Sequence, residues 1–207
     1  MAFSGWPAEA LEFYEGLEAD NSKSYWTSHK VVYDDKVRRP MEELVARLAD
    51  EFGEPKIFRP YRDVRFSHDK TPYKTHIGAV LGGACYVELS ADGFATGAGR
   101  WRFDPDGLAR YRKAVASDLT GPELTKITES LENDGIEIRG YGSLKSAPRG
   151  YSADHPRIGL LRHKGLAAFR GWPPEPWLYT AEAADHVAEF LRATAVLRDW
   201  LVTHTGG

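Results

Sequence analysis

The sequence predicts an α+β protein in which an antiparallel sheet packs against N-terminal and C-terminal helices. Two observations carry this prediction. Apolar residues recur every three or four positions near both ends of the chain, which is the helical period, whereas the middle of the chain alternates with a period of two. The strands of the middle follow one another across short turns instead of alternating with helices, so we expect neighbouring strands to pair antiparallel.

Helical patterns occupy the first quarter of the chain. The first runs from Pro7 to about Glu18, because proline suits a first helical turn and the run carries one apolar stripe. We expect Asn21 to cap the second helix, since its side-chain oxygen can accept a hydrogen bond from the first turn. Pro40 should interrupt the pattern before a third helix, Met41–Phe52, because proline lacks an amide donor and clashes with the preceding turn.

The central strands are separated by turn-forming residues. Gly82-Gly83 and Asp92-Gly93 are dipeptides typical of tight hairpins. The candidate strands of this region are Ile57–Phe66, His76–Leu81, Cys85–Ser90 and Phe94–Phe103.

Helices return in the second half of the chain. Asp104 is expected to cap a helix through Val115, and Gly121-Pro122 to start another that ends near Gly135. Amphipathic spacing predicts one long last helix, from Ala181 to about Thr203. The shorter elements expected between them are two strands and a helical turn or two: Ile136–Arg139, Leu166–Phe169 and Pro156–His163. No repeat or linker divides the chain, so we expect a single domain over residues 1–207.

Composition limits the classes of function. With a net charge of -3, the molecule as a whole is not a cation that would bind polyanions. Binding of nucleic acid or phosphate would therefore need a local positive patch. The single cysteine, Cys85, excludes an internal disulfide and favours a reducing compartment. With no signal-like start and no long apolar run, we expect a soluble cytoplasmic protein away from membranes. Gly97-Ala98-Gly99 lacks the spacing of a dinucleotide loop, and no cofactor is predicted.

The segment between Lys56 and His76 reverses the sign of the chain's charge. It contains six cations against two anions, Asp63 and Asp69. The cations are Lys56, Arg59, Arg62, Arg65, Lys70 and Lys74. Such a local excess of positive charge in an acidic chain marks the segment as the candidate functional region.

The strand period sorts these charges between two faces. In an extended Ile57–Phe66, successive side chains point to opposite sides. One face would be apolar except for Arg62, and the other would carry Arg59, Asp63 and Arg65. Arg62 must then reach solvent or a partner, because an unpaired buried charge is very costly.

Two explanations of the arginines compete. In the structural one, carboxylates from elsewhere complete an internal ion-pair lattice, and the chain is a structural or protein-interaction module. In the functional one, the remaining positive charge binds a small molecule that bears phosphate or carboxylate, which guanidinium groups hold through paired hydrogen bonds. Whether such a site would only bind its ligand or also process it, as an enzyme, is left open by the residues.

The functional explanation gives each polar residue a role. Asp63 would orient the guanidinium groups, and His76 would transfer protons because its pKa lies nearest neutrality. The ligand-binding cations would be Arg59, Arg62, Arg65, Lys70 and Lys74. Nucleic-acid binding through the same cations and nearby aromatics is a third reading, which the acidic overall balance disfavours. No metal site is predicted, because the surrounding cations would repel a metal held by His68, Asp69 and His76.

Three blocks of the chain occur in the order seen in one family: NSKSYWTSHKVVYDDKVRRP, FRPYRDVRFSHDKTPYKTHIGA and PRGYSADHP. With the glycines near Gly97 and Gly99, these blocks resemble the uncharacterised family catalogued as domain of unknown function 2461, from about Pro7 to the last helix. The resemblance implies a single-domain, soluble, mostly bacterial or fungal protein. It implies no established activity and carries over no catalytic residue. This chain has Ser22 where a typical member has a second Asn, and Thr27 where many have Phe.

Overall fold

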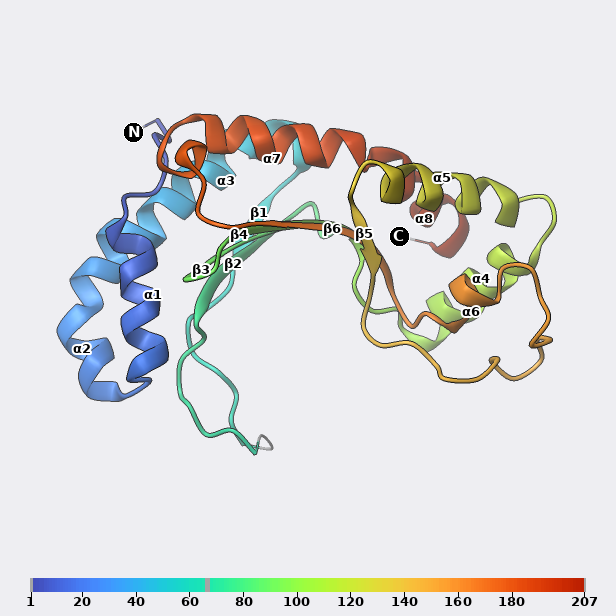
Figure 1. Ribbon diagram of the computed structural model, residues 1–207, viewed down its shortest axis with the longest axis horizontal. Helices are drawn as coiled ribbons and strands as arrows, with labels where there is room; N and C mark the ends of the chain where they lie inside the picture. Colours follow the sequence, from blue (N-terminus) through green and yellow to red (C-terminus); the bar gives the residue numbers. More distant parts are fainter. Residues whose placement is uncertain (1, 66–67, 207) are drawn as a thin grey trace. The chain divides into compact units, whose positions relative to one another are not determined.

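The computed structural model describes residues 2–65 and 68–206, and it confirms the α+β class. Within these residues, six strands form a sheet with the order β1-β2-β3-β4-β6-β5 (Figure 1). β2 pairs antiparallel with β1 and β3, and β5 pairs antiparallel with β6. The chain divides into two compact units, residues 1–96 with 171–190 and residues 97–170 with 191–207. The single domain over residues 1–207 stays a prediction.

Unit 1 combines the N-terminal helices with the first strands. Its helices before the sheet are α1 (Glu9–Ala19), α2 (Lys23–Val32), η1 (Tyr33–Arg38) and α3 (Arg39–Phe52). Its strands are β1 (Pro55–Ile57), β2 (His76–Leu81), β3 (Cys85–Ser90) and the start of β4 (Gly93–Arg100). The 3-10 helix η2 (Pro176–Tyr179) and most of α7 (Glu182–Ala193) complete it. α1 contacts α2 and β3, and α3 contacts β1 and β2 (Figure 1).

The strand period decides which side of β3 faces the core. Cys85, Val87 and Leu89 are buried, whereas the residues between them are half-buried. The predicted bounds of β2 and β3 are confirmed at both ends, and the register sets Leu81 opposite Cys85 across the Gly82-Gly83 turn.

The expected break at Pro40 is wrong. Pro40 lies in the first turn of α3, and the helix runs into it through η1, a six-residue π-helix over Tyr33–Arg38. The Arg39 N–H bonds to the Asp34 carbonyl, five residues back, so the wider turn ends directly before the proline. A first-turn position needs no amide donor, which is why proline is tolerated there.

Unit 2 contains mainly helices. They are α4 (Pro105–Ala116), α5 (Gly121–Asn133), α6 (Ile158–Arg162) and α8 (Ala195–Thr205). The strands are β5 (Glu137–Arg139) and β6 (Leu166–Trp172), whose last two residues belong to unit 1. Asp104 caps α4 as predicted, because its carboxylate accepts from the Gly107 N–H at 2.7 Å. α8 packs on α4 and α5.

The single long C-terminal helix is wrong in one respect. The amphipathic pattern is continuous, but α7 ends at Ala193 and α8 begins at Ala195. Thr194 between them is fully buried and has a ψ of 3°, outside the helical range. The apolar period of the sequence does not reveal such a one-residue break, because the apolar stripe continues on both sides of it.

Candidate functional site

The charged segment forms an irregular two-stranded arm, defined here as the described residues between Phe58 and Thr75. The Lys74 N–H donates to the Pro60 carbonyl at 2.8 Å, and the Arg62 N–H donates to the Pro72 carbonyl at 2.9 Å. Figure 1 shows the arm, in teal, extending beyond β2.

The predicted strand Ile57–Phe66 is wrong as a regular element, since β1 ends at Ile57. Pro60 and Pro72 have no N–H to donate, so each leaves a gap in the ladder, and only an isolated bridge between Tyr61 and Tyr73 forms. Phe66 lies outside the described residues.

The alternation inferred for the arm is nevertheless present. Over residues 58–65, the first part of the arm, four residues are half-buried: Phe58, Pro60, Arg62 and Val64. The four that alternate with them are exposed: Arg59, Tyr61, Asp63 and Arg65. The extended backbone thus separates the two faces even without regular pairing, and it places Arg62 on the inner side.

Asn21 ties the arm to the helices. Its side-chain amide donates to the Tyr73 carbonyl and accepts from the Tyr73 N–H, both at 3.0 Å, as a neighbouring strand would. The Tyr73 ring stacks on Trp26 of α2 with centroids 4.4 Å apart. The predicted cap at Asn21 is wrong, because the Ser22 hydroxyl caps α2 by accepting from the Tyr25 N–H. Serine and asparagine are both good caps, so the departure from the family at Ser22 keeps this function.

A polar cleft of about 440 Å³ lies between the arm and the turn that joins α1 to α2. Its lining residues are Glu18, Asn21, Arg62, Asp69, Thr71, Tyr73, Lys74, Thr75 and His76. Three of the predicted site residues, Arg62, Lys74 and His76, therefore meet at one cavity.

Arg62 has the partner that its half-buried position requires. Its guanidinium donates to the Asp69 carboxylate and to the Thr71 hydroxyl. Asp69 also accepts from the Thr71 N–H at 2.9 Å and from the Thr71 hydroxyl at 2.8 Å. These hydrogen bonds join the two strands of the arm to each other at the wall of the cleft.

We expect the Asp69 carboxyl to titrate at an unusually low pH. The hydrogen bond from Arg62, helped by those from Thr71, lowers the pKa of Asp69 from 3.8 to about 2. A lowered pKa means that the contribution to stability is present above pH 3.8 and is lost as the pH falls through about 2. NMR titration of the carboxyl carbons should give a midpoint near 2, and Arg62→Gln should move it back toward 3.8. An unchanged midpoint in that variant would contradict the assignment.

The other predicted residues lie outside the cleft lining. Asp63 pairs with Arg65, whose Nη2 lies 2.6 Å from Oδ2, and this hydrogen bond lowers the pKa of Asp63. Lys70 donates to the Val64 carbonyl at 3.0 Å. Within the described residues, Arg59 makes no ion pair. Asp63, which was predicted to orient the guanidinium groups, thus pairs with one arginine, Arg65, in the described part of the arm.

His76 stands beside a carboxylate and a phenol of the neighbouring strand. Its Nε2 lies 3.7 Å from an oxygen of Glu88, which also accepts from the Tyr86 hydroxyl. Burial lowers the pKa of His76, and Lys74 lowers it further, while Glu88 opposes both. The imidazole is therefore neutral at pH 7 and can accept a proton.

Lys74 carries the second unusual charge of the cleft. Burial lowers its pKa first, and the nearby charge of Arg59 lowers it further, while Glu88 opposes both. Its ammonium lies 5.2 Å from the centre of the Phe58 ring. In the parts of the chain that the structure describes, no carboxylate lies within ion-pair distance of Lys74.

Sequence reasoning missed three contributors to this region: Glu18, the pairing role of Asn21, and Glu88. Glu18 and Asn21 lie far from the arm in sequence, and Glu88 belongs to β3. The antiparallel register, which sets His76 opposite Ser90, brings Glu88 within reach of His76. The predicted antiparallel pairing of His76–Leu81 with Cys85–Ser90 is the one sequence signal that could have placed Glu88 near His76.

Comparison with known proteins identifies the family. The profile of the family described as "Conserved hypothetical protein (DUF2461)" matches residues 9–200, and the chain therefore belongs to this family. The resemblance inferred from the three sequence blocks is thereby confirmed. No curated protein and no solved structure matches the chain.

Residues 2–65 and 68–206 contain no group of three or more His, Cys, Asp or Glu side chains arranged to hold a metal ion. Nor does the described part of the chain include a helix of the length and apolarity that a bilayer span requires.

Proposed function

We propose that the protein binds a small anionic molecule, bearing phosphate or carboxylate, at the cleft beneath the arm. The observation that carries the proposal is Lys74, a half-buried cation at the cleft that has no carboxylate within ion-pair distance among the described residues. Arg59 adds a second positive charge nearby, and two such cations cost free energy unless an anion compensates them. A ligand anion bound by Lys74 in the cleft would supply that compensation.

Some of the other lining residues suit the same ligand. Thr75 and the Asn21 amide are neutral polar groups at the cleft. His76 is neutral and lies beside Glu88, so it could accept a proton from a bound molecule. The proposal therefore includes a binding protein and an enzyme, and it assigns His76 the proton-transfer step if a reaction occurs. We also propose that the protein acts in the cytoplasm of a bacterium, where small phosphorylated and carboxylated metabolites are available.

A melting-temperature screen tests the proposal. Inorganic phosphate, sulfate, phosphorylated metabolites and dicarboxylates would be compared with sodium chloride at equal ionic strength. A ligand at a hundred times its dissociation constant should stabilise the fold by about 2.7 kcal/mol. Equal shifts with chloride would mean that the ions only screen charge, and the proposal would fail.

We expect Lys74→Gln to weaken binding of the anion found in that screen by about tenfold or more, because it removes a charge-assisted hydrogen bond. Isothermal titration would measure the affinity. Lys56→Gln, at an exposed lysine of β1, is the matched control, since it removes the same charge outside the cleft. If both variants bind alike, Lys74 does not hold the anion.

A second candidate, the structural module, is favoured by a separate observation. Arg62 and Arg65 are each paired to a carboxylate within the arm, Asp69 and Asp63. If these pairs only hold the arm together, Arg62→Met should loosen it, while no anion should raise the melting temperature of the wild-type protein. Binding of an anion that Lys74→Gln weakens would exclude this reading as the whole role of the segment.

A further inference from the structure

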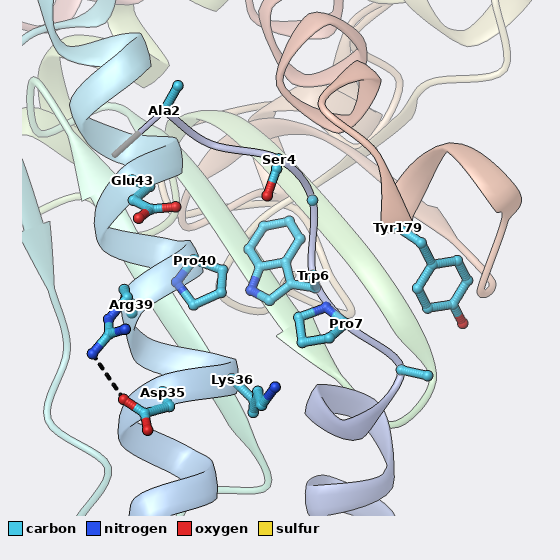
Figure 2. Close-up of a pocket in the computed structure, with 12 residues that line it drawn as sticks. Ala2, Ser4, Trp6, Pro7, Asp35, Lys36, Arg39, Pro40, Glu43 and Tyr179 are labelled. Carbon is cyan, nitrogen blue, oxygen red and sulfur yellow. Dashed lines mark hydrogen bonds and ion pairs between the residues drawn. The ribbon is translucent and has the colours of Figure 1, made fainter.

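A second pocket of unit 1 shares no lining residue with the cleft. It measures about 570 Å³, within the range of about 300–1,000 Å³ typical of small-molecule sites. One wall is the N-terminal segment from Ala2 to Ala8, and the other is a face of η1 and α3 (Figure 2). Both walls are held by buried residues, Trp6 on one side and Pro40 on the other.

Trp6 offers this pocket a hydrogen-bond donor that no described residue satisfies. The side chain is fully buried, and its Nε1 has no acceptor. Ring contacts with Phe3 at 5.2 Å and Phe94 at 5.3 Å, and a backbone bond to the Leu178 carbonyl, fix the indole in place. Figure 2 shows the nitrogen-bearing edge turned toward Pro40 across the pocket. A fixed, buried donor without a partner calls for an acceptor from outside the chain.

The opposite wall has an unusual backbone. Asp35 and Lys36 belong to the π-helix η1, and Arg39 and Glu43 follow on the same face of α3. π-Helices are rare and are concentrated at functional sites. The wider turn is therefore a second observation, independent of the indole, that points to a ligand here.

The charges of the pocket are balanced. Asp35 and Glu43 oppose Lys36 and Arg39. Arg39 pairs with Asp35 at 2.8 Å, and Lys36 pairs with Glu9 at 3.7 Å; all four side chains are about half exposed, so each pair contributes little and can open for a ligand. In the described chain, Glu43 forms no ion pair. A pocket with both signs disfavours a pure anion or cation and suits a neutral molecule that carries both charges.

We infer that this pocket binds a zwitterion of the amino-acid class. The ligand carboxylate would accept from Trp6 Nε1 and face Lys36 or Arg39, and its ammonium would face Glu43. An apolar side chain would rest on Pro7 and Pro40. This inference is independent of the anion cleft, which no residue of this pocket lines.

Titration calorimetry with the twenty amino acids tests it, together with the amine and the acid that lack one charged group of the best ligand. We expect at least one amino acid to bind, and both single-charge analogues to bind at least tenfold more weakly. If only the acids bind, or only the amines, the zwitterion is wrong. If no amino acid binds, the inference is overturned.

Trp6→Phe separates the donor from the ring, because phenylalanine keeps an aromatic side chain and lacks the N–H. We expect affinity to fall tenfold or more. The matched control is Tyr14→Phe, which removes another buried polar group without a partner that does not line the pocket. Glu43→Gln, at a half-buried residue that forms no ion pair in the described chain, should weaken binding of the amino acid but not of its deaminated acid. Unchanged affinity in Trp6→Phe and Glu43→Gln would overturn the assignment.

Discussion

Replacing Trp26 with alanine should lower the free energy of unfolding by about 3–5 kcal/mol, the usual cost of removing a buried aromatic side chain. Trp26 is 4% exposed and contacts the rings of Tyr73, Tyr33 and Phe13, with centroids 4.4, 4.7 and 5.8 Å away. The stack on Tyr73 also holds the arm against α2. The variant should therefore lose anion binding at the cleft along with stability. Urea unfolding followed by fluorescence would measure the loss of stability.

The control for this variant is Trp101→Ala. Trp101 is 54% exposed, so the same truncation should remove little packing and cost less than about 1 kcal/mol. Equal costs in the two variants would show that Trp26 does not anchor the arm.

Replacing Gly5 with alanine should cost about 3 kcal/mol or more, from backbone strain and overpacking together. Gly5 has a φ of 98°, and an added Cβ would lie 2.3 Å from the backbone carbon of Tyr179. Neither side can yield without moving the N-terminal segment that forms one wall of the Trp6 pocket. Thermal and urea unfolding would measure the stability, and amino-acid binding should be lost with the displaced wall.

Gly83→Ala isolates the backbone contribution. Gly83 has a φ of 75°, yet nothing lies within 4 Å of the added Cβ. That substitution should cost only about 1–2 kcal/mol, the strain of a positive φ. If the two glycines cost the same, the close approach of Gly5 to Tyr179 is not important for stability.

Local sequence patterns predicted much of the fold. The bounds of β2 and β3 follow from the alternation of apolar residues between glycine turns, and Asp104, a capping residue, predicts the start of α4. Each of these features depends on a few neighbouring residues, so it can be recognised without the rest of the chain. The predictions at Pro40 and Thr194 failed where a helix changed its geometry, by widening or by breaking, while its apolar stripe continued.

The candidate site was predicted in part. Parity correctly placed Arg62 on the inner face of the arm, and its partner Asp69 is one of the two anions of the same segment. The contacts of Asn21 with Tyr73 and of Glu88 with His76 were not predictable from spacing, because each joins separate elements. The role of the prolines was underestimated: Pro60 and Pro72 turn an expected strand into an irregular arm.

Charge illustrates the difference between pattern and packing. The whole chain has a net charge of -3, but unit 1 has 12 Lys and Arg against 20 Asp and Glu, whereas unit 2 has 15 against 10. The cationic arm therefore belongs to the more acidic unit, where carboxylates such as Asp69 and Asp63 pair two of its arginines. An excess of cations in a sequence segment does not reveal how many of them stay uncompensated.

The order of residues was enough to establish the α+β class and the alternating faces of the arm, since both depend on interactions between near neighbours in the chain. The family followed directly from the three sequence blocks. Folding was needed to bring Arg62, Lys74 and His76 to one cleft and to leave the Trp6 indole facing a pocket without an acceptor. Those arrangements depend on contacts between distant segments, and a buried donor or an uncompensated cation is recognised only when all its neighbours are in place.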